Sequence, residues 1–263
     1  MYKRQLLHSS LWGNRADLSN LTVSLGASGG LAARDERHNI LIDHTEKVRR
    51  IVTGGVRRID FVNDNVGLDL LYDLALIDLV LRQGWVGRVV CHLKDHPLFV
   101  SDAMLHDLHT TVSLLAVSPQ GAVRALGERL RRHLATGKLA LQADPFWTSF
   151  LMYRDFPPGL RDTLSRSDLV ILKGDVNYRR LLDDRHWPHT TPLEEIVSYF
   201  PAPLLVLRTL KGEIQVGLEP GQAGALAAED PNWLINGQRG LVQYNNPHNY
   251  RPAPAAGADT GTE

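Results

Sequence analysis

The chain has 263 residues, 43% of them hydrophobic, and its 29 basic residues balance its 29 acidic ones. A chain of this length can bury a full hydrophobic core, and a formal charge of zero argues against a nucleic-acid-binding surface, which normally carries a basic excess. The single cysteine, Cys91, excludes an internal disulfide framework and fits a reducing compartment. Because no segment has the length of a membrane span and no signal peptide opens the chain, we expect a cytoplasmic protein.

The two ends of the sequence differ from its middle. The first residues run into an apolar segment with no turn or cap, which suggests an N-terminally incomplete protein or a cloning scar. Residues 36–53 have an amphipathic pattern that predicts a helix, and Gly54 closes it as a C-cap. Residues 251–263 (RPAPAAGADTGTE) form a Pro/Ala/Gly-rich tail that we expect to be disordered.

The most informative stretch is residues 58–70, which read RIDFVNDNVGLDL. Its β-branched and aromatic residues predict a buried strand, and the apolar residues after Asn65 recur at helical spacing. Asp64 and Asn65 therefore lie at the carboxyl end of a strand, where ligands bind in open α/β sheets. Their oxygen atoms suit a hard cation or a substrate, although the same residue types also serve as plain helix caps.

A second strand is predicted for residues 87–93 (GRVVCHL). Cys91 lies inside this apolar run, so we interpret it as a core residue rather than a nucleophile. Asp102 is expected to open a helix over residues 102–115, and the spacing of apolar residues predicts a further helix over 119–135.

Two histidines on the first of these helices have a spacing that can hold zinc. His106 and His109 stand three apart, and His92 and His96 are nearby in the sequence. No cysteine or carboxylate accompanies them at the spacing of a zinc motif. We therefore do not predict zinc binding, and the role of the two histidines stays open.

The rest of the chain continues the alternation of strands and helices. Residues 139–141 predict a short edge strand, and the aromatic residues 144–153 are expected to pack as a lid over the core. Residues 168–173 and 204–207 predict two more apolar strands, while residues 193–200 look helical.

Polar side chains follow four of these apolar strands. Strands that alternate with helices build a parallel sheet, so the four carboxyl ends should lie along one edge. Helix caps alone would explain the acids but not the basic residues at the same edge. Acids, an amide and two cations together suit a divalent cation that faces a phosphate. The residues are Asp64, Asn65, Asp102, Asp175, Arg208 and Lys211.

Five stretches carry a resemblance to a known family. They are LWGNRADLS from residue 11, IDFVNDNVGLDLLYDL from 59, HPLFVSDAMLHD from 96, DLVILKGDVNYRRLL from 168 and LRTLK from 207. In this order they resemble the metal-dependent damage-control phosphatases, in the subfamily marked by an Arg-Thr-x-Lys motif. The resemblance implies a three-layer α/β/α sandwich with a mostly parallel, Rossmann-like central sheet. It also implies hydrolysis of phosphate monoesters, including fructose phosphates and related sugar phosphates.

The resemblance also implies roles for individual residues. Asp64, Asn65 and Asp102 would be the ligands of a divalent cation, with Mn²⁺ first and Mg²⁺, Co²⁺ or Ni²⁺ as alternatives. Lys211 would lie on the phosphate side and complete the catalytic set. The remaining substrate-binding positions would be Asn14, Asp69, Asp175, Asn177, Tyr178, Arg179 and Arg208.

Members of the family carry a substantial helical segment ahead of the Trp-Gly-Asn stretch. We therefore expect residues 1–54 to be the remnant of a largely missing N-terminal helical part with a connecting loop. Residues 55–250 would form the α/β catalytic domain, followed by the disordered tail from 251.

The expected reaction is in-line attack on a sugar phosphate by a metal-activated water. The expected partner is a small phosphorylated metabolite, with no nucleic acid and no membrane, and the oligomeric state is open. One alternative is an S-adenosylmethionine-dependent protein carboxyl methyltransferase, an activity attributed to a relative in the family. The turn after the first strand reads Asp-Asn-Val-Gly, however, rather than a glycine-rich nucleotide loop. The other alternative is a non-catalytic fragment that binds sugar phosphates.

Overall fold

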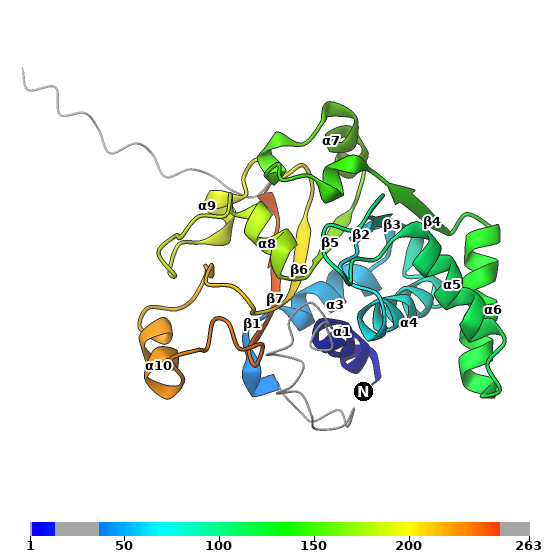
Figure 1. The fold of residues 1–263 in the computed structure, drawn as a ribbon, viewed down its shortest axis with the longest axis horizontal. Helices are drawn as coiled ribbons and strands as arrows, with labels where there is room; N and C mark the ends of the chain where they lie inside the picture. Colours follow the sequence, from blue (N-terminus) through cyan, green and yellow to red (C-terminus); the bar gives the residue numbers. More distant parts are fainter. Residues whose placement is uncertain (1, 14–36, 248–263) are drawn as a thin grey trace, which may run out of the picture.

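A seven-stranded sheet organises the chain in the computed structural model, which describes residues 2–13 and 37–247 (Figure 1). The strand order is β1-β7-β6-β5-β2-β3-β4, and every pair in it is parallel except β6 with β7. The mostly parallel α/β sheet that the sequence predicts is therefore confirmed. The strands are β1 (Ile40–Asp43), β2 (Val56–Val62), β3 (Val86–Leu93), β4 (Leu139–Ala143), β5 (Leu169–Lys173), β6 (Leu204–Thr209) and β7 (Gly240–Asn245).

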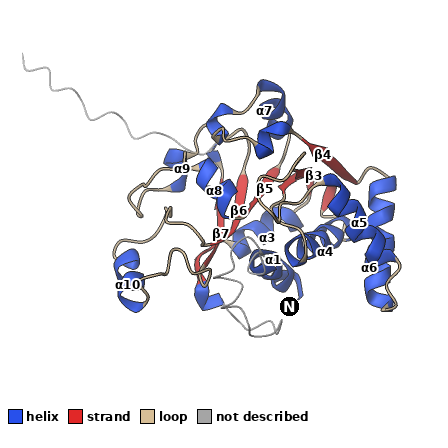
Figure 2. Cartoon of the chain, in the orientation of Figure 1, coloured by secondary structure: helices blue, strands red, loops and turns tan. Residues whose placement is uncertain are grey.

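Helices cover both faces of this sheet and enclose a separate hydrophobic core on each face. Helices α1, α3, α4, α5 and α6 contribute to one core, and α7 to α10 contribute to the other, which gives three layers. Figure 2 shows the two sets on opposite sides of the strands. The helices are α1 (Tyr2–Gly13), α3 (Thr45–Thr53), α4 (Leu68–Arg82), α5 (Leu105–Ala116), α6 (Gly121–Ala135), α7 (Pro158–Ser165), α8 (Asp175–Leu181), α9 (Leu193–Ile196) and α10 (Gln222–Glu229). Within the described ranges, none of them is long and apolar enough to cross a membrane.

The path of the chain through the sheet creates a switch point between β2 and β5. From β2 the chain moves outward through β3 to β4, then returns to β5 on the other side of β2 and continues to β6. Helix α4 follows β2 on one face, whereas α8 follows β5 on the opposite face. Doubly wound sheets bind ligands at such a switch point, outside the carboxyl ends of the two strands whose connections leave in opposite directions.

One predicted element is wrong in its first half. The sequence predicts a helix over residues 36–53, but Ile40–Asp43 forms β1 and only Thr45–Thr53 forms helix α3, with Gly54 as its C-cap. Strand β1 pairs in parallel with β7 from the far end of the chain. This long-range pairing overrides the local helical pattern. Helix α9 also ends at Ile196, short of the predicted residue 200.

The aromatic connection after β4 packs as the sequence predicts. Phe146, Trp147 and Tyr153 are buried in the second core, whereas Phe150 is 86% exposed. The buried guanidinium of Arg180 holds the connection by donating hydrogen bonds to its main-chain carbonyls, including those of Phe146 (2.9 Å) and Trp147 (3.1 Å). Only Phe150 departs from the predicted lid over the core.

Helix α1 belongs to the first core rather than to its periphery. Leu7 and Leu11 are buried there, and the carbonyl of Leu11 accepts a hydrogen bond from the Thr209 hydroxyl at the end of β6 (3.1 Å). At Gly240 in β7, a Cβ atom would lie 2.9 Å from the Trp12 ring. Glycine at this position therefore lets the end of α1 pack directly on the sheet.

Candidate functional site

Asp64 lies at the switch point, against the backbone that follows β5. A Cβ atom at Gly174 would lie 2.0 Å from Asp64 Oδ2, and Gly174 has a φ of +86°. Both the close approach and the backbone conformation require glycine there. The carboxylate that follows β2 and the chain that follows β5 are thus brought into direct contact.

Neither Asp64 nor Asn65 caps the helix that follows, so a plain cap is not their role. Helix α4 begins at Leu68 behind Gly67, which adopts a φ of 74° and serves as the N-cap. The Asn65 amide nitrogen donates to Asp64 Oδ2 (2.8 Å), and Asn65 Oδ1 accepts from the Ser101 hydroxyl (2.8 Å). The two side chains therefore face each other and the next loop instead of the helix terminus.

Asp102 joins this pair through the backbone. An isolated antiparallel bridge connects Asn65 with Asp102, and Asp102 Oδ2 accepts hydrogen bonds from the main-chain N–H groups of Leu98 and Phe99 (2.8 Å each). The prediction that Asp102 opens a helix is wrong, because α5 begins at Leu105 and its first turn is capped by Asp107. The Asp102 carboxylate therefore holds the loop before it and does not cap helix α5.

Lys94 is a component of this site that sequence reasoning missed. Its buried Nζ lies 3.0 Å from Asp102 Oδ1, 3.2 Å from the carbonyl oxygen of Asp64 and 3.7 Å from Asp64 Oδ1. The one signal in the sequence is a lysine that directly follows the apolar strand β3. Two carboxylates and one ammonium thus meet behind the switch point.

The other half of the site forms around Asp175, which opens helix α8. Its Oδ1 accepts hydrogen bonds from Arg208 Nε (2.7 Å) and from the main-chain N–H of Lys211 (3.1 Å). A Cβ atom at Gly212 would lie 2.7 Å from Asp175 Oδ2, so the turn after β6 also passes directly over this carboxylate. The end of β6 and the start of α8 are locked together at Asp175.

Arg208 supports Asp175 from behind instead of pointing outward. It is fully buried, and its guanidinium also donates to the carbonyls of Gly212 (2.9 Å) and Ile214 (2.5 Å). It lies over the ring of Tyr178, with 4.3 Å between Cζ and the ring centroid. Arg208 therefore reaches the site through Asp175 and the turn that carries Lys211.

The other predicted residues of helix α8 divide into buried and exposed ones. Asn177 is buried, donates to the Lys173 carbonyl (2.8 Å) and accepts from the hydroxyl of Tyr153. Tyr178 is also buried, and burial raises its pKa to about 12. Arg179 is exposed and pairs with Asp184 (2.7 Å). The predicted residue Asn14 lies outside the described residues.

Asp69 lies behind the site in a second buried ionic cluster. Its Oδ1 lies 2.8 Å from Nζ of Lys173, which also lies 2.7 Å from Asp73 Oδ1 and 2.9 Å from the Ser10 hydroxyl. Burial alone would lower the Lys173 pKa, but Asp69 and Asp73 outweigh it and raise this pKa to about 12. Burial raises the pKa of Asp73. Asp69 touches the site through its other oxygen, 3.3 Å from the main-chain N–H of Asn65.

The donor set of Asp64, Asn65 and Asp102 fits a hard divalent cation. It offers two carboxylates and an amide oxygen, which are the ligand types that Mg²⁺ and Mn²⁺ prefer. The Ser101 hydroxyl and the N–H groups before Asp102 orient these side chains, as outer partners do in metal sites. The amide of Asn65 points its nitrogen toward Asp64, and a half-turn about the last side-chain bond presents the oxygen instead.

Residues 2–13 and 37–247 contain no group of three His, Cys, Asp or Glu side chains placed to hold a metal. His106 is exposed and pairs with Asp107 (3.1 Å). His92 is buried and lies 2.6 Å from Asp60 Oδ1. These histidines therefore form no zinc site among the described residues.

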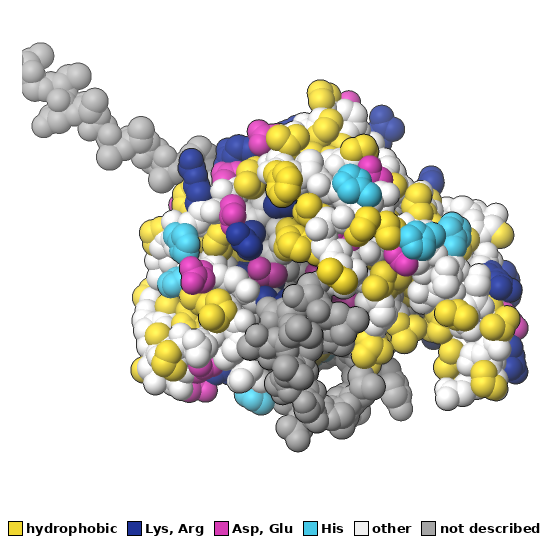
Figure 3. Space-filling view, in the orientation of Figure 1, with side chains coloured by type: hydrophobic (Ala, Val, Ile, Leu, Met, Phe, Trp, Pro, Cys, Tyr) yellow, Lys and Arg dark blue, Asp and Glu magenta, His cyan; other side chains and the backbone are white. Residues whose placement is uncertain are grey.

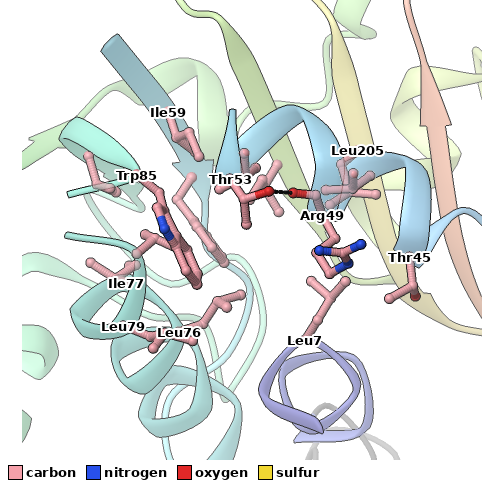
Figure 4. A pocket seen from close by; sticks show the side chains of 16 residues that line it. Leu7, Thr45, Arg49, Thr53, Ile59, Leu76, Ile77, Leu79, Trp85 and Leu205 are labelled. Atoms are coloured by element: carbon pink, nitrogen blue, oxygen red, sulfur yellow. Dashed lines mark hydrogen bonds between the residues drawn. The ribbon is translucent and has the colours of Figure 1, made fainter. Parts of the chain in front are cut away.

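The structure also contains a cavity of ≈ 70 Å³ on the α3 and α4 side of the sheet. Figure 4 shows Trp85 on one side of it and Arg49 of helix α3 on the other, with Leu7 of α1 nearby. Its lining is almost entirely apolar and includes none of the predicted site residues. The chemistry of the carboxyl edge, not this cavity, therefore marks the candidate site.

Comparison with known proteins identifies one family over most of the chain. Residues 2–226 match the model of the damage-control phosphatase ARMT1-like domain. The chain is 38% identical over 260 residues to damage-control phosphatase ARMT1 of Mus musculus and 34% identical over 261 residues to that of Homo sapiens, covering 92% of this chain in both cases. It spans 58% of the length of each of these relatives.

Among solved structures, a DUF89 family protein from Pyrococcus horikoshii aligns with 93% of this chain and 71% of its own. The identity is 15% and the TM-score 0.47, so this likeness bears on neither the fold nor the activity. The match over residues 2–226 includes the ends of β2, β3, β5 and β6, where the site lies. The chain belongs to the damage-control phosphatase family with the ARMT1-like domain.

Proposed function

We propose that this chain hydrolyses phosphate monoesters of sugars, of the fructose 1-phosphate and fructose 6-phosphate class, with the help of a divalent cation. Its partner is then a small phosphorylated metabolite. The observation that carries the proposal is the contact of Asp64 with Gly174 at the switch point, which joins the acidic cluster to the Asp175 side. Membership of a phosphatase family supports the reaction type.

In this proposal Asp64, Asn65 and Asp102 hold the cation, which is Mn²⁺ or, as alternatives, Mg²⁺, Co²⁺ or Ni²⁺. When bound, such a cation polarises the phosphoryl oxygens and lowers the pKa of the attacking water. Asp102 is held for this task by two main-chain N–H groups, and Asn65 by Ser101. Apart from the half-turn of the Asn65 amide, these side chains are already held in place, and such preorganisation favours electrostatic catalysis.

The Asp175 side of the site would bind the rest of the substrate. Lys211 lies in the turn held by Arg208 and neutralises negative charge that grows on the phosphoryl group. Asp175 keeps Oδ2 beside Gly212 and accepts hydrogen bonds from sugar hydroxyls. Exposed Arg179 lies next to Gly212 and lines the outer rim of the site.

The direct test measures phosphate release from a panel of sugar phosphates with each of the four cations. We expect fructose phosphates to be hydrolysed with Mn²⁺, and we expect Asp64→Asn and Asp102→Asn to lower kcat/KM by on the order of 100-fold or more. Asp162→Asn, an exposed carboxylate on helix α7, is the matched control and should not change the rate. Undiminished hydrolysis in Asp64→Asn would overturn the cation assignment.

The same experiment separates catalysis from binding alone. A cation and a sugar phosphate that together raise the melting temperature without any phosphate release would indicate a binding protein instead of an enzyme. Equilibrium binding of S-adenosylmethionine in the absence of cations would point to methyl transfer.

A further inference from the structure

The cluster around Lys94 has an arrangement that the proposed reaction does not yet use. The ammonium has three acceptors within reach: Asp102 Oδ1 at 3.0 Å, the Asp64 carbonyl at 3.2 Å and Asp64 Oδ1 at 3.7 Å. The acceptors belong to Asp64 and Asp102, which are two of the three residues proposed to hold the cation. The ammonium therefore provides positive charge at the same carboxylates that a divalent cation would use.

The backbone fixes Lys94 in this place. Its main-chain N–H donates to the Ala103 carbonyl (3.0 Å), and a parallel bridge joins Lys94 to Met104. The Ala103 N–H in turn donates to the Asp64 carbonyl (2.9 Å). This backbone frame fixes the main chain of Lys94 and burial confines its side chain, so the ammonium is already beside the carboxylates before any cation binds.

We propose that Lys94 is a positioning residue that makes binding of the cation and binding of the phosphate depend on each other. In the free protein the ammonium neutralises part of the charge of Asp64 and Asp102 and holds the two carboxylates together. It opposes a divalent cation by like-charge repulsion until a phosphate dianion binds and offsets both positive charges. This inference rests on the proposed function, because it assumes that Asp64 and Asp102 hold the cation.

Thermodynamic linkage makes the proposal quantitative. If phosphate raises the affinity for the cation by some factor, the cation must raise the affinity for phosphate by the same factor. Removal of the Lys94 charge removes the repulsion, so the cation alone should bind more tightly and phosphate should add less. A lysine with a purely structural role would give the opposite result, because its loss would loosen the two carboxylates and lower the affinity for the cation.

The test measures Mn²⁺ binding by isothermal titration calorimetry with and without inorganic phosphate. In the wild type we expect phosphate to raise Mn²⁺ affinity by about tenfold or more, a coupling in the usual range. In Lys94→Met we expect Mn²⁺ alone to bind about tenfold more tightly and the effect of phosphate to shrink to about threefold or less. Lys138→Met, which removes an exposed lysine, is the matched control and should behave as the wild type.

A second variant and two further outcomes keep the coupling role of Lys94 testable. Lys94→Gln keeps hydrogen-bond donors without the charge and carries the same expectation, so it replaces Lys94→Met if that variant does not fold. If Mn²⁺ binds, is lost in Asp102→Asn and is unchanged or weaker in Lys94→Gln, the coupling role is overturned while the proposed function stands. If the folded wild type binds no Mn²⁺ with or without phosphate, both are overturned.

Discussion

Two buried lysines in this molecule each contact two aspartates, but their surroundings differ. Lys173, the last residue of β5, lies between Asp69 and Asp73, and Lys94, directly after β3, lies between Asp64 and Asp102. Lys173 is 0% exposed and Lys94 is 6% exposed. Both clusters thus combine one ammonium with two carboxylates close to the carboxyl edge of the sheet.

The difference lies in how completely each ammonium is enclosed. Lys173 contacts its two carboxylates at 2.8 and 2.7 Å and also the hydroxyl and carbonyl of Ser10, so helix α1 closes the cluster. Lys94 contacts Asp102 at 3.0 Å and Asp64 Oδ1 only at 3.7 Å, and Asp64 lies against Gly174 at the switch point. The same charges therefore stabilise the fold where helix α1 covers them, whereas at the switch point they belong to the candidate site.

The largest expected effect is on stability and comes from Lys173→Met. It leaves two carboxylates buried without their cation, which should cost about 3–5 kcal/mol of the free energy of unfolding. Urea denaturation followed by circular dichroism measures this cost. Lys94→Met should be less destabilising, because the Lys94 cluster lies at the switch point and is not closed by α1. An equal loss of stability would contradict the contrast between the two clusters.

The next largest effect on stability should distinguish Gly174 at the switch point from a glycine in an open turn. Gly174→Ala puts a methyl group against the Asp64 carboxylate and should lower stability by about 1–3 kcal/mol more than Gly55→Ala. Gly55 is the matched control because its φ is also positive, +94°, but a Cβ atom there would meet nothing within 4 Å. Phosphate release and Mn²⁺ binding should fall in Gly174→Ala alone. If the two substitutions had equal effects on stability, phosphate release and Mn²⁺ binding, the close approach of Asp64 to Gly174 would have no role in the site.

A smaller effect should come from the support of Asp175. Arg208→Lys keeps the charge but loses the hydrogen bonds that only a guanidinium can make, so the turn that carries Lys211 should loosen. We expect KM for a sugar phosphate to rise by about tenfold, with Mn²⁺ affinity unchanged. A fall in Mn²⁺ affinity would show that the two halves of the site are not separable.

The smallest expected effect is on the stability of the protein at low pH. Burial would raise the pKa of Asp60, but hydrogen bonds from His92, Arg58 and Ser167 outweigh it and lower this pKa. The folded state then binds the proton less tightly than the unfolded state, so stability is present above about pH 4 and is lost as the pH falls further. Asp60→Asn should flatten this acid limb in urea titrations between about pH 5 and 2.5.

For Asp73, in the cluster around Lys173, we expect the opposite dependence of stability on pH. Because the pKa of Asp73 is raised, its carboxyl group does not contribute to the loss of stability below about pH 4. Asp73→Asn should therefore leave the slope of the acid limb unchanged. A flatter limb in this variant would show that folding lowers the pKa of Asp73 instead of raising it.

The sequence predicts the parts of this fold that local patterns determine. The apolar runs that form β2, β3, β5 and β6 and the polar groups at their ends were readable, because a buried parallel strand is a short hydrophobic run. Strands β1 and β7 were missed, because β1 depends on pairing with the far end of the chain and β7 runs antiparallel beside β6. Their short sequences carry no comparable local signal.

The site was predictable in its residue types but not in its assembly. The acids, Asn65 and Lys211 follow from strand ends and from the family resemblance, and their roles remain proposals. The bridge between Asn65 and Asp102 and the place of Lys94 between the acids depend on how two loops meet. The contact of Gly174 with Asp64 depends on the strand order, which one sequence does not specify.

The contact between Ser10 and Lys173 has a consequence for biosynthesis. The two residues are 163 positions apart, so helix α1 leaves the ribosome long before the strand that carries its ionic partner. The strands on which α1 packs, β6 and β7, are synthesised later still, and contacts of such sequence separation slow folding. We therefore expect the nascent chain to depend on chaperones until at least residue 173 has emerged.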